Sequence, residues 1–204
     1  FPYTTLFRSD IVGLSIGTRP DCVDDEKLKL IASFKDDYYT WIEYGLQSCN
    51  DKTLNLINRG HDFNCFKRTV EKTKNFGINI CAHVILGLPS ETHDDMMQTA
   101  IELAKLGIDG VKIHMLCVLE GTALEKMYSE GSIKLMSEEE YVNLVCDFLE
   151  ILPSNVTIHR LAGNGLKREL IEPRWIGKKL NTLNMIDREF ERRCTWQGSQ
   201  NVIV

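Results

Sequence analysis

The sequence predicts an α/β fold built around a parallel sheet. Short apolar runs recur at intervals of roughly thirty residues, and segments with helical patterns and capping residues separate them. The apolar runs are nearly continuous rather than alternating, as strands covered on both faces require. Polar residues stand where several runs end, which is where parallel α/β folds place their functional side chains. Right-handed crossovers leave two architectures open, a doubly wound sheet and an α/β barrel.

Each element is predicted from its own pattern and end signals. The strands are expected over residues 11–17, 40–46, 78–88, 110–118 and 156–159. Helices are expected over 24–36, 51–58, 62–76, 92–106, 122–130, 137–151 and 177–193, and loops at 163–165 and 173–175. Asp24, Asp51 and Asp62 are suitable N-caps because their carboxylates can accept from free backbone N–H groups. Gly77 and Gly107 can adopt the left-handed backbone that ends a helix.

The chain of 204 residues is long enough to bury one core. We interpret residues 1–9 as a non-native leader, because they begin without an initiator Met and do not fit the pattern of the strand that follows. Residues 10–161 then form the domain of strands and helices, and residues 162–204 form a mainly helical C-terminal extension. On this interpretation the chain is the C-terminal part of a longer protein.

The charge distribution and hydropathy limit the possible partners. The net charge of −5 argues weakly against a nucleic-acid binder. From Arg160 onward, however, nine Lys and Arg residues outnumber five Asp and Glu residues. This basic segment suits an anionic partner, but a solvated helical tail explains the same charges and is favoured. No apolar run approaches about 20 residues and no signal peptide is evident, so a cytoplasmic protein without a membrane span is expected.

The seven cysteines do not form a local metal-binding motif. They stand at positions 22, 49, 65, 81, 117, 146 and 194, and the closest pairs are sixteen residues apart. Because no CxxC or CxxxCxxC spacing exists, no metal site is predicted in this chain. An odd number of cysteines in a cytosolic setting is expected to stay reduced. Cys81 and Cys146 are interpreted as small core residues.

Candidate site residues follow from the strand ends. They are Thr18, Arg19 and Asp21 after the first strand, Glu43 and Gln47 in the second, His83 and the turn Gly87–Leu88–Pro89 in the third, Lys112 and His114 in the fourth, and His159 and Arg160 in the fifth. Together with Arg59, which can pair with a carboxylate, they suit a zwitterionic ligand. Glu43 inside an apolar strand is costly unless it is paired, which favours a barrel interior.

Each candidate also has a purely structural interpretation. Glu43 can pair with a lysine, and Gln47 can satisfy loop backbone. Arg59 can close a helix, His114 can be a structural histidine, and Lys112 can extend from a strand end towards solvent.

Several motifs resemble one enzyme superfamily. They are Ser15-Ile16-Gly17-Thr18-Arg19-Pro20-Asp21, Glu43-Tyr44-Gly45-Leu46-Gln47, Ile57-Asn58-Arg59-Gly60-His61, Gly87-Leu88-Pro89 and Gly110-Val111-Lys112-Ile113-His114. This combination resembles the radical S-adenosylmethionine (radical SAM) superfamily, in the branch of oxygen-independent coproporphyrinogen dehydrogenase and the elongator-type tRNA-modifying proteins. Within that branch it looks like an uncharacterised bacterial subfamily with a late Trp and Gln-Gly, here Trp175 and Gln197-Gly198. The resemblance covers residues 10 to about 200.

The resemblance implies a fold and a chemistry. The fold would be the C-terminal part of a partial (βα)6 radical SAM barrel with a C-terminal extension. The cofactors would be S-adenosylmethionine and a [4Fe-4S] cluster, which together yield methionine and a 5′-deoxyadenosyl radical that takes hydrogen from the substrate. The cluster ligands would lie in an N-terminal part that this chain lacks, so the chain by itself is expected to be inactive. The expected partners are a small-molecule or tRNA substrate and an electron donor such as flavodoxin or ferredoxin.

The resemblance also assigns cofactor-binding roles. Gln47 and Arg59 match a pair that contacts S-adenosylmethionine in the coproporphyrinogen branch. His83 stands where that branch has a ribose-binding aspartate, and Glu43 matches an elongator-type glutamate implied to contact the cofactor's amino group. The full set implied is Thr18, Glu43, Gln47, Arg59, His83, Gly87, Pro89, Lys112 and His114. No catalytic residue is assigned.

Two other functions stay open. A non-radical barrel lyase of the aldolase type can use Lys112 as a Schiff-base amine, since that chemistry needs a desolvated lysine at a strand end. An RNA-binding module can use the basic C-terminal segment and would bind in a salt-sensitive way.

Overall fold

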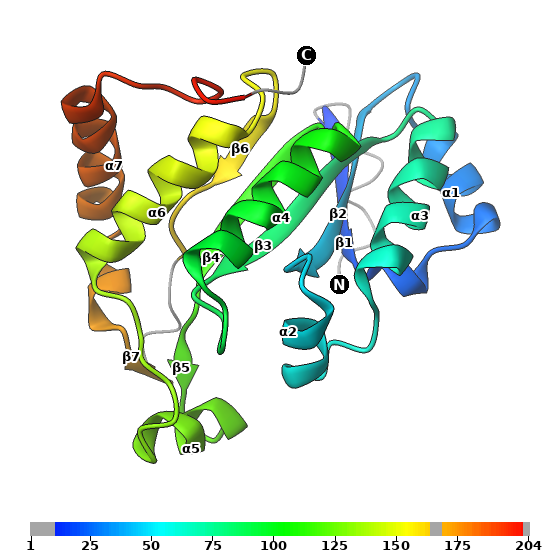
Figure 1. Ribbon diagram of the computed structural model, residues 1–204. Helices are drawn as coiled ribbons and strands as arrows, with labels where there is room; N and C mark the ends of the chain where they lie inside the picture. The colour runs from blue at the N-terminus through cyan, green and yellow to red at the C-terminus, as the bar shows by residue number, and fades with distance from the viewer. Residues whose placement is uncertain (1–10, 164–168, 202–204) are drawn as a thin grey trace.

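In the computed structural model, which describes residues 11–163 and 169–201, five strands form one parallel sheet in the order β1–β2–β3–β4–β6 (Figure 1). These strands are β1 (Gly13–Thr18), β2 (Tyr39–Gln47), β3 (Asn79–Leu86), β4 (Gly110–Met115) and β6 (Thr157–Arg160). Each pairs in parallel with the next along the chain. The predicted α/β fold with a parallel sheet is therefore confirmed.

The helices of the described residues are α1 (Asp25–Ala32), α2 (Asp51–Leu56), α3 (Phe63–Asn75), α4 (His93–Leu106), α5 (Ala123–Ser129), α6 (Glu138–Ile151) and α7 (Lys179–Arg193), with 3-10 turns η2 (Pro20–Cys22) and η3 (Arg174–Gly177). Helices α3, α4 and α6 lie over one face of the sheet, whereas α5 lies beside β5 and α7 packs on α6 (Figure 1). In the described part of the chain, no helix combines the length and apolar character needed to cross a membrane.

Side chains at the helix starts explain most of the helix boundaries. Asp24 accepts from Lys27 N at the start of α1, and Asp62 accepts from Cys65 N at the start of α3. The N-cap predicted at Asp51 is wrong, because Asn50 caps α2. The Asp51 carboxylate instead accepts from the backbone N–H of Phe63 at 2.7 Å, which ties α2 to α3.

Other sequence boundaries also need correction. The helix expected over 24–36 ends at Ala32, where consecutive turns begin. The strand expected over 110–118 splits, because β5 (Val118–Leu119) leaves the main sheet and pairs antiparallel with β7 (Leu170–Glu172). β7 was not predicted, and its three residues are too few to show a periodic pattern. The 3-10 turn η3 starts inside the loop expected at 173–175. The expected leader at 1–9 and most of the loop at 163–165 lie outside the described residues.

The core lies between the sheet and the helices. Its fully buried side chains include Ile42, Tyr44, Leu46, Ile80, Val84, Val111 and Ile113 from the strands and Phe66, Val70, Ala100, Leu103, Val145 and Phe148 from the helices. Because side chains alternate along a strand, the intervening residues point to the opposite face. We call this second face the inner face. It carries Ser15, Gly17, Trp41, Glu43, Gly45, Cys81, His83, Ile85, Gly110, Lys112 and His114.

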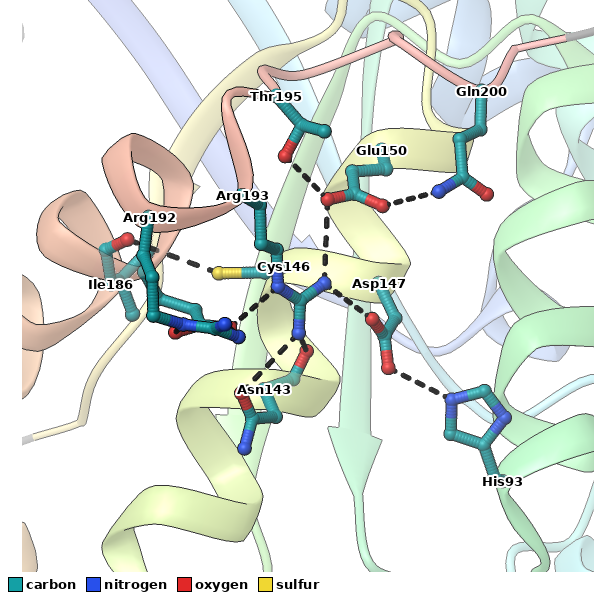
Figure 2. A network of polar contacts seen from close by, with 11 residues as sticks. His93, Asn143, Cys146, Asp147, Glu150, Ile186, Arg192, Arg193, Thr195 and Gln200 are labelled. Carbon is teal, nitrogen blue, oxygen red and sulfur yellow. Dashed lines mark hydrogen bonds and ion pairs between the residues drawn. The ribbon is translucent and has the colours of Figure 1, made fainter.

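Arg193 holds the C-terminal extension against the domain of strands and helices. Figure 2 shows this arginine of α7 surrounded by polar groups of α6 and of its own helix. Its Nη1 donates to Asp147 Oδ1 at 2.5 Å and to Glu150 Oε1 at 3.3 Å, and its Nε donates to Glu189 at 2.6 Å. Burial works to lower the pKa of Arg193, but its hydrogen bonds to Glu189 and Asp147 outweigh burial and raise the pKa.

Glu150 extends this network to the last described residues. Its side chain is 3% exposed, and besides Arg193 it accepts from Thr195 Oγ1 and Gln200 Nε2, each at 2.6 Å. Gln197 Nε2 donates to the carbonyl of Val156 at 2.8 Å, next to β6. A buried carboxylate needs such partners, so the C-terminal segment is fixed by polar contacts rather than by apolar packing alone.

We predict that Arg193→Met destabilises the protein by about 3 kcal/mol, because it leaves the buried Glu150 carboxylate without its cation. The free energy of unfolding from urea titration measures this. Arg192→Met is the matched control: the Arg192 side chain is 72% exposed, and Glu189 keeps its contact with Arg193. Equal effects of the two substitutions would contradict the structural role of Arg193.

Candidate functional site

A single carboxylate links four strands on the inner face. Glu43 Oε1 of β2 accepts from Ser15 Oγ of β1 at 2.5 Å, and its Oε2 contacts His83 Nε2 of β3 at 2.7 Å. The same Oε2 forms an ion pair with Lys112 Nζ of β4. The side chains of Glu43 and Lys112 are 11% and 18% exposed, so the pair is largely removed from water.

The protonation states of this cluster follow from its contacts. Burial works to raise the pKa of Glu43, but hydrogen bonds from Lys112, Ser15 and His83 outweigh burial and lower the pKa to about 2. Glu43 is therefore a carboxylate at neutral pH. Burial lowers the pKa of His83, and the contact with Glu43 opposes this only in part. His83 is then a neutral ring whose Nε2 carries the proton and donates to Glu43.

A second histidine lies beside the first. The ring centroids of His83 and His114 are 5.5 Å apart. Burial, together with nearby cationic groups, lowers the pKa of His114 to about 4, so its ring is neutral at pH 7. Its Nε2 is buried and has no hydrogen-bond partner among the described residues. A buried ring nitrogen without a partner is costly, which indicates that a ligand group can satisfy it.

An aromatic contact lies further down the inner face. The rings of Trp41 and His159 meet edge to face, with centroids 4.5 Å apart. They meet over Gly110, where an added Cβ would lie 2.7 Å from His159 Nε2 and 2.9 Å from Trp41 Cζ3. Only glycine at position 110 leaves space for this contact.

A β-bulge changes the direction of the last residues of β6. Gly110 and Val111 pair with Thr157 and Ile158, but Lys112 pairs with Arg160, so His159 is the extra residue. Residues that pair in register point to the same face, so Arg160 shares the inner face with Lys112. His159 also reaches this face through its contact with Trp41. The bulge therefore places two successive polar side chains on one side.

A second group of polar residues surrounds Gly45 at the end of β2. The register shifts between Gly45 and Gln47, and Gln47 has φ +78°, in the left-handed region. Arg59 donates to the carbonyl of Gly45 from Nε at 3.1 Å and from Nη2 at 2.6 Å, and His61 Nε2 lies 3.2 Å from the same oxygen. An added Cβ at Gly45 would lie 2.3 Å from Arg59 Nη2 and 2.9 Å from Gln47 Nε2. Glycine is therefore needed for the two side chains to converge.

Arg59 forms no ion pair within the described ranges 11–163 and 169–201. Burial lowers the pKa of its half-buried guanidinium, and the nearby charge of Arg19 acts in the same direction. The neighbouring carboxylate of Asp21 is occupied by a two-point contact from Arg19. Arg59 thus keeps N–H donors at a strand end without an anionic partner.

The remaining predicted cofactor residues lie apart from these two groups. Thr18 pairs in register with Tyr44, which points into the helix-covered core, so Thr18 does not join the inner face. Gly87 has φ +85° in the turn after β3, and its N–H donates to Met96 Sδ at 3.2 Å. Pro89 is buried in the same turn. The structure therefore brings Glu43, His83, Lys112 and His114 together and gathers Gln47 and Arg59 around Gly45, without testing their predicted roles.

Three contributors to the site were not assigned a role from the sequence. Ser15 lies two residues before Gly17, which is the register partner of Glu43. Because side chains alternate along a strand, Ser15 is expected on the same face as Glu43. Trp41 lies two residues before Glu43 on the same strand, so alternation also places it on the face of Glu43. Arg160 was seen at a strand end, but no sequence pattern indicated the bulge that turns it inward.

The cysteines take no visible part in this site. All seven, each within the described ranges, are free thiols. Burial raises the pKa of Cys81 to about 12, so its thiol is unreactive at neutral pH. Among the described residues, no group of three or more His, Cys, Asp or Glu side chains is arranged to hold a metal ion.

We predict that Glu43→Gln destabilises the protein by about 3 kcal/mol at pH 7, because it leaves the Lys112 ammonium without its counter-ion. The folded-state pKa of Glu43 is lowered, so its contribution is present above pH ~4.3 and is lost as the pH falls towards 2. Urea titrations between pH 7 and 2 should show the difference between the two proteins shrinking. Glu71→Gln, on an exposed position of α3, is the control. A difference that does not change with pH would contradict this assignment.

Comparisons with known proteins agree with this architecture. The radical SAM superfamily model matches residues 6–119, and the radical SAM C-terminal domain model matches residues 108–192. The chain is 43% identical over 195 residues to the uncharacterized protein YtqA of Bacillus subtilis, covering 96% of this chain and 61% of YtqA. It is 41% identical over 198 residues to the uncharacterized protein MJ0486 of Methanocaldococcus jannaschii, covering 96% and 62%. The chain thus spans about three-fifths of the length of these relatives.

A solved structure supports the same fold. Elp3 of the archaeon Methanocaldococcus infernus, with an N-terminal deletion, superposes with a TM-score of 0.77 at 23% identity. The match covers 91% of this chain and 43% of Elp3. The superfamily model covers more than half of the sequence and the sheet has the matching architecture, so the chain belongs to the radical SAM superfamily.

Proposed function

We propose that this chain is part of a radical SAM enzyme that binds S-adenosylmethionine at the carboxyl end of its sheet. The function proposed is that of the whole protein, since the chain covers 61% of the relative YtqA. With a reduced [4Fe-4S] cluster, bound S-adenosylmethionine supplies a 5′-deoxyadenosyl radical for hydrogen abstraction.

The observation that carries the proposal is the unpaired guanidinium of Arg59. It is half-buried, it is oriented by the carbonyl of Gly45, and it lacks an ion-pair partner among the described residues. A partly buried cation without a counter-ion is unfavourable, so this position suits an anionic ligand group. The carboxylate of S-adenosylmethionine has the charge and the planar shape that the guanidinium prefers.

The residues around Arg59 fit a zwitterionic cofactor. The amide nitrogen Nε2 of Gln47, whose backbone is left-handed, lies beside the same glycine. The amide group of Gln47 can both donate and accept. Gly45 has no side chain, so a ligand can approach the backbone next to Arg59. In this proposal Arg59 binds the carboxylate and Gln47 orients the bound group.

Glu43 already has hydrogen-bond partners within the chain that would compete with the amino group of the cofactor. Its two carboxylate oxygens already accept from Ser15, His83 and Lys112. A ligand ammonium would have to share or replace the Lys112 contact. We therefore propose that Glu43 acts mainly by holding His83 and Lys112 in place, while His83 presents its second ring nitrogen to the bound cofactor.

The alternative functions are less well supported. A Schiff-base lysine must present its amine to the substrate carbonyl, whereas Lys112 Nζ is engaged by the Glu43 carboxylate. For RNA binding, Arg192 and Arg193 of the basic extension are engaged by Glu189, Asp147 and Glu150. Their charge is largely neutralised within the protein.

The partners of the enzyme stay as proposals. The substrate is either a small molecule or a tRNA, and the electron donor is a flavodoxin or a ferredoxin. A cytoplasmic location fits both classes of partner.

We predict that Arg59→Met weakens S-adenosylmethionine binding at least about tenfold, because it removes a charged hydrogen-bond donor. Isothermal titration calorimetry on the chain measures this. Anaerobic formation of methionine and 5′-deoxyadenosine by the cluster-loaded whole protein provides the second measurement. Arg68→Met, at an exposed position of α3, is the matched control. Equal binding by wild type and Arg59→Met, or no cofactor cleavage by the loaded whole protein, would sink the proposal.

A further inference from the structure

Arg160 is a cation on the inner face that the cofactor proposal does not use. Its side chain is exposed, and it forms no ion pair or hydrogen bond with any described residue. The bulge at His159 places it beside Lys112 in the register of β4 and β6. Bulges are frequent next to active sites because they change the direction of a side chain, as this one does.

A histidine on the adjacent strand β4 also lacks a partner. His114 Nε2 is buried and unsatisfied among the described residues, and the register partner of His114 on β3 is the apolar Ile85. The positive charges of Arg160 and Lys112 both contribute to keeping the His114 ring uncharged, which places Arg160 within electrostatic range of it. Within the described residues, the Arg160 guanidinium and the His114 ring nitrogen both lack partners, and they belong to adjacent strands and to the same inner face.

The charges on this part of the inner face do not cancel. Glu43 neutralises Lys112 through their ion pair, and the two histidines are neutral. Within residues 11–163 and 169–201, no carboxylate pairs with Arg160. A negatively charged group would restore the balance and could also accept from the Nε2–H tautomer of His114.

We propose that Arg160 and His114 form a subsite for an oxyanion, a carboxylate or a phosphate, that is carried by the substrate. This inference rests on the proposed function in one respect, because it names the chemical class of that enzyme's substrate. The cofactor carboxylate is assigned to Arg59 at the end of β2, whereas Arg160 lies on β6, with β3 and β4 between them. The two cations thus serve two different anionic groups.

The test follows the His114 ring by NMR during pH titrations of the chain, with and without inorganic phosphate or acetate. A bound anion favours the charged imidazolium, so we expect saturable binding that raises the pKa of His114. Arg160→Gln should weaken this binding at least tenfold. Arg188→Gln, which removes the same charge from an exposed position of α7, should leave it unchanged. The anion that binds more tightly identifies the substrate group.

Two outcomes would overturn the inference. One is the absence of a saturable shift at His114, or an equal shift in Arg160→Gln, which would make Arg160 a solvated surface cation. The other is an equal loss of S-adenosylmethionine binding in Arg160→Gln and Arg59→Met, which would assign the subsite to the cofactor. The anion titration needs no cofactor, so it can succeed even if the proposed function fails.

Discussion

The contact on which the inner face depends is the carboxylate of Glu43. A charged side chain inside a parallel sheet is unfavourable unless its hydrogen-bond capacity is filled, and here donors from β1, β3 and β4 fill it. The same contacts fix the orientation of Lys112 and the tautomer of His83. One residue on β2 thus determines what the neighbouring strands present to a ligand, and each strand must keep its register for the cluster to form.

The two bulges add to this arrangement at the ends of the sheet. An ideal β6 strand would turn Arg160 towards the helices, since every second side chain changes face. The register shift within β6 brings Arg160 to the inner face, whereas the shift at the end of β2 accompanies the left-handed backbone of Gln47 beside Gly45. In the proposed enzyme, the bulge in β2 serves the cofactor and the bulge in β6 serves the substrate. The strands between them supply the histidines.

The C-terminal extension is attached by a different kind of interaction. Helix α6 packs its apolar face on the core, and its polar face receives Arg193 and the residues that follow it (Figure 2). The ion pairs make the position of α7 specific, because a buried Glu150 tolerates few alternative partners. Of the basic residues of the extension, Arg193 is the one that pairs with acidic groups of α6 among the described residues.

The sequence by itself determined the fold class, the order of the main strands and the position of most helices. These follow from short-range causes, namely apolar runs, capping side chains such as Asp62 and glycines such as Gly107 that end helices. The sequence also identified Glu43, His83 and Lys112 as strand residues that belong together, since parallel strands align their carboxyl ends. Only the tertiary structure decided that Thr18 faces the core, that β5 pairs with β7, and that Arg160 turns inward. These depend on strand register and on pairing between distant segments, and neither leaves a local pattern in the chain.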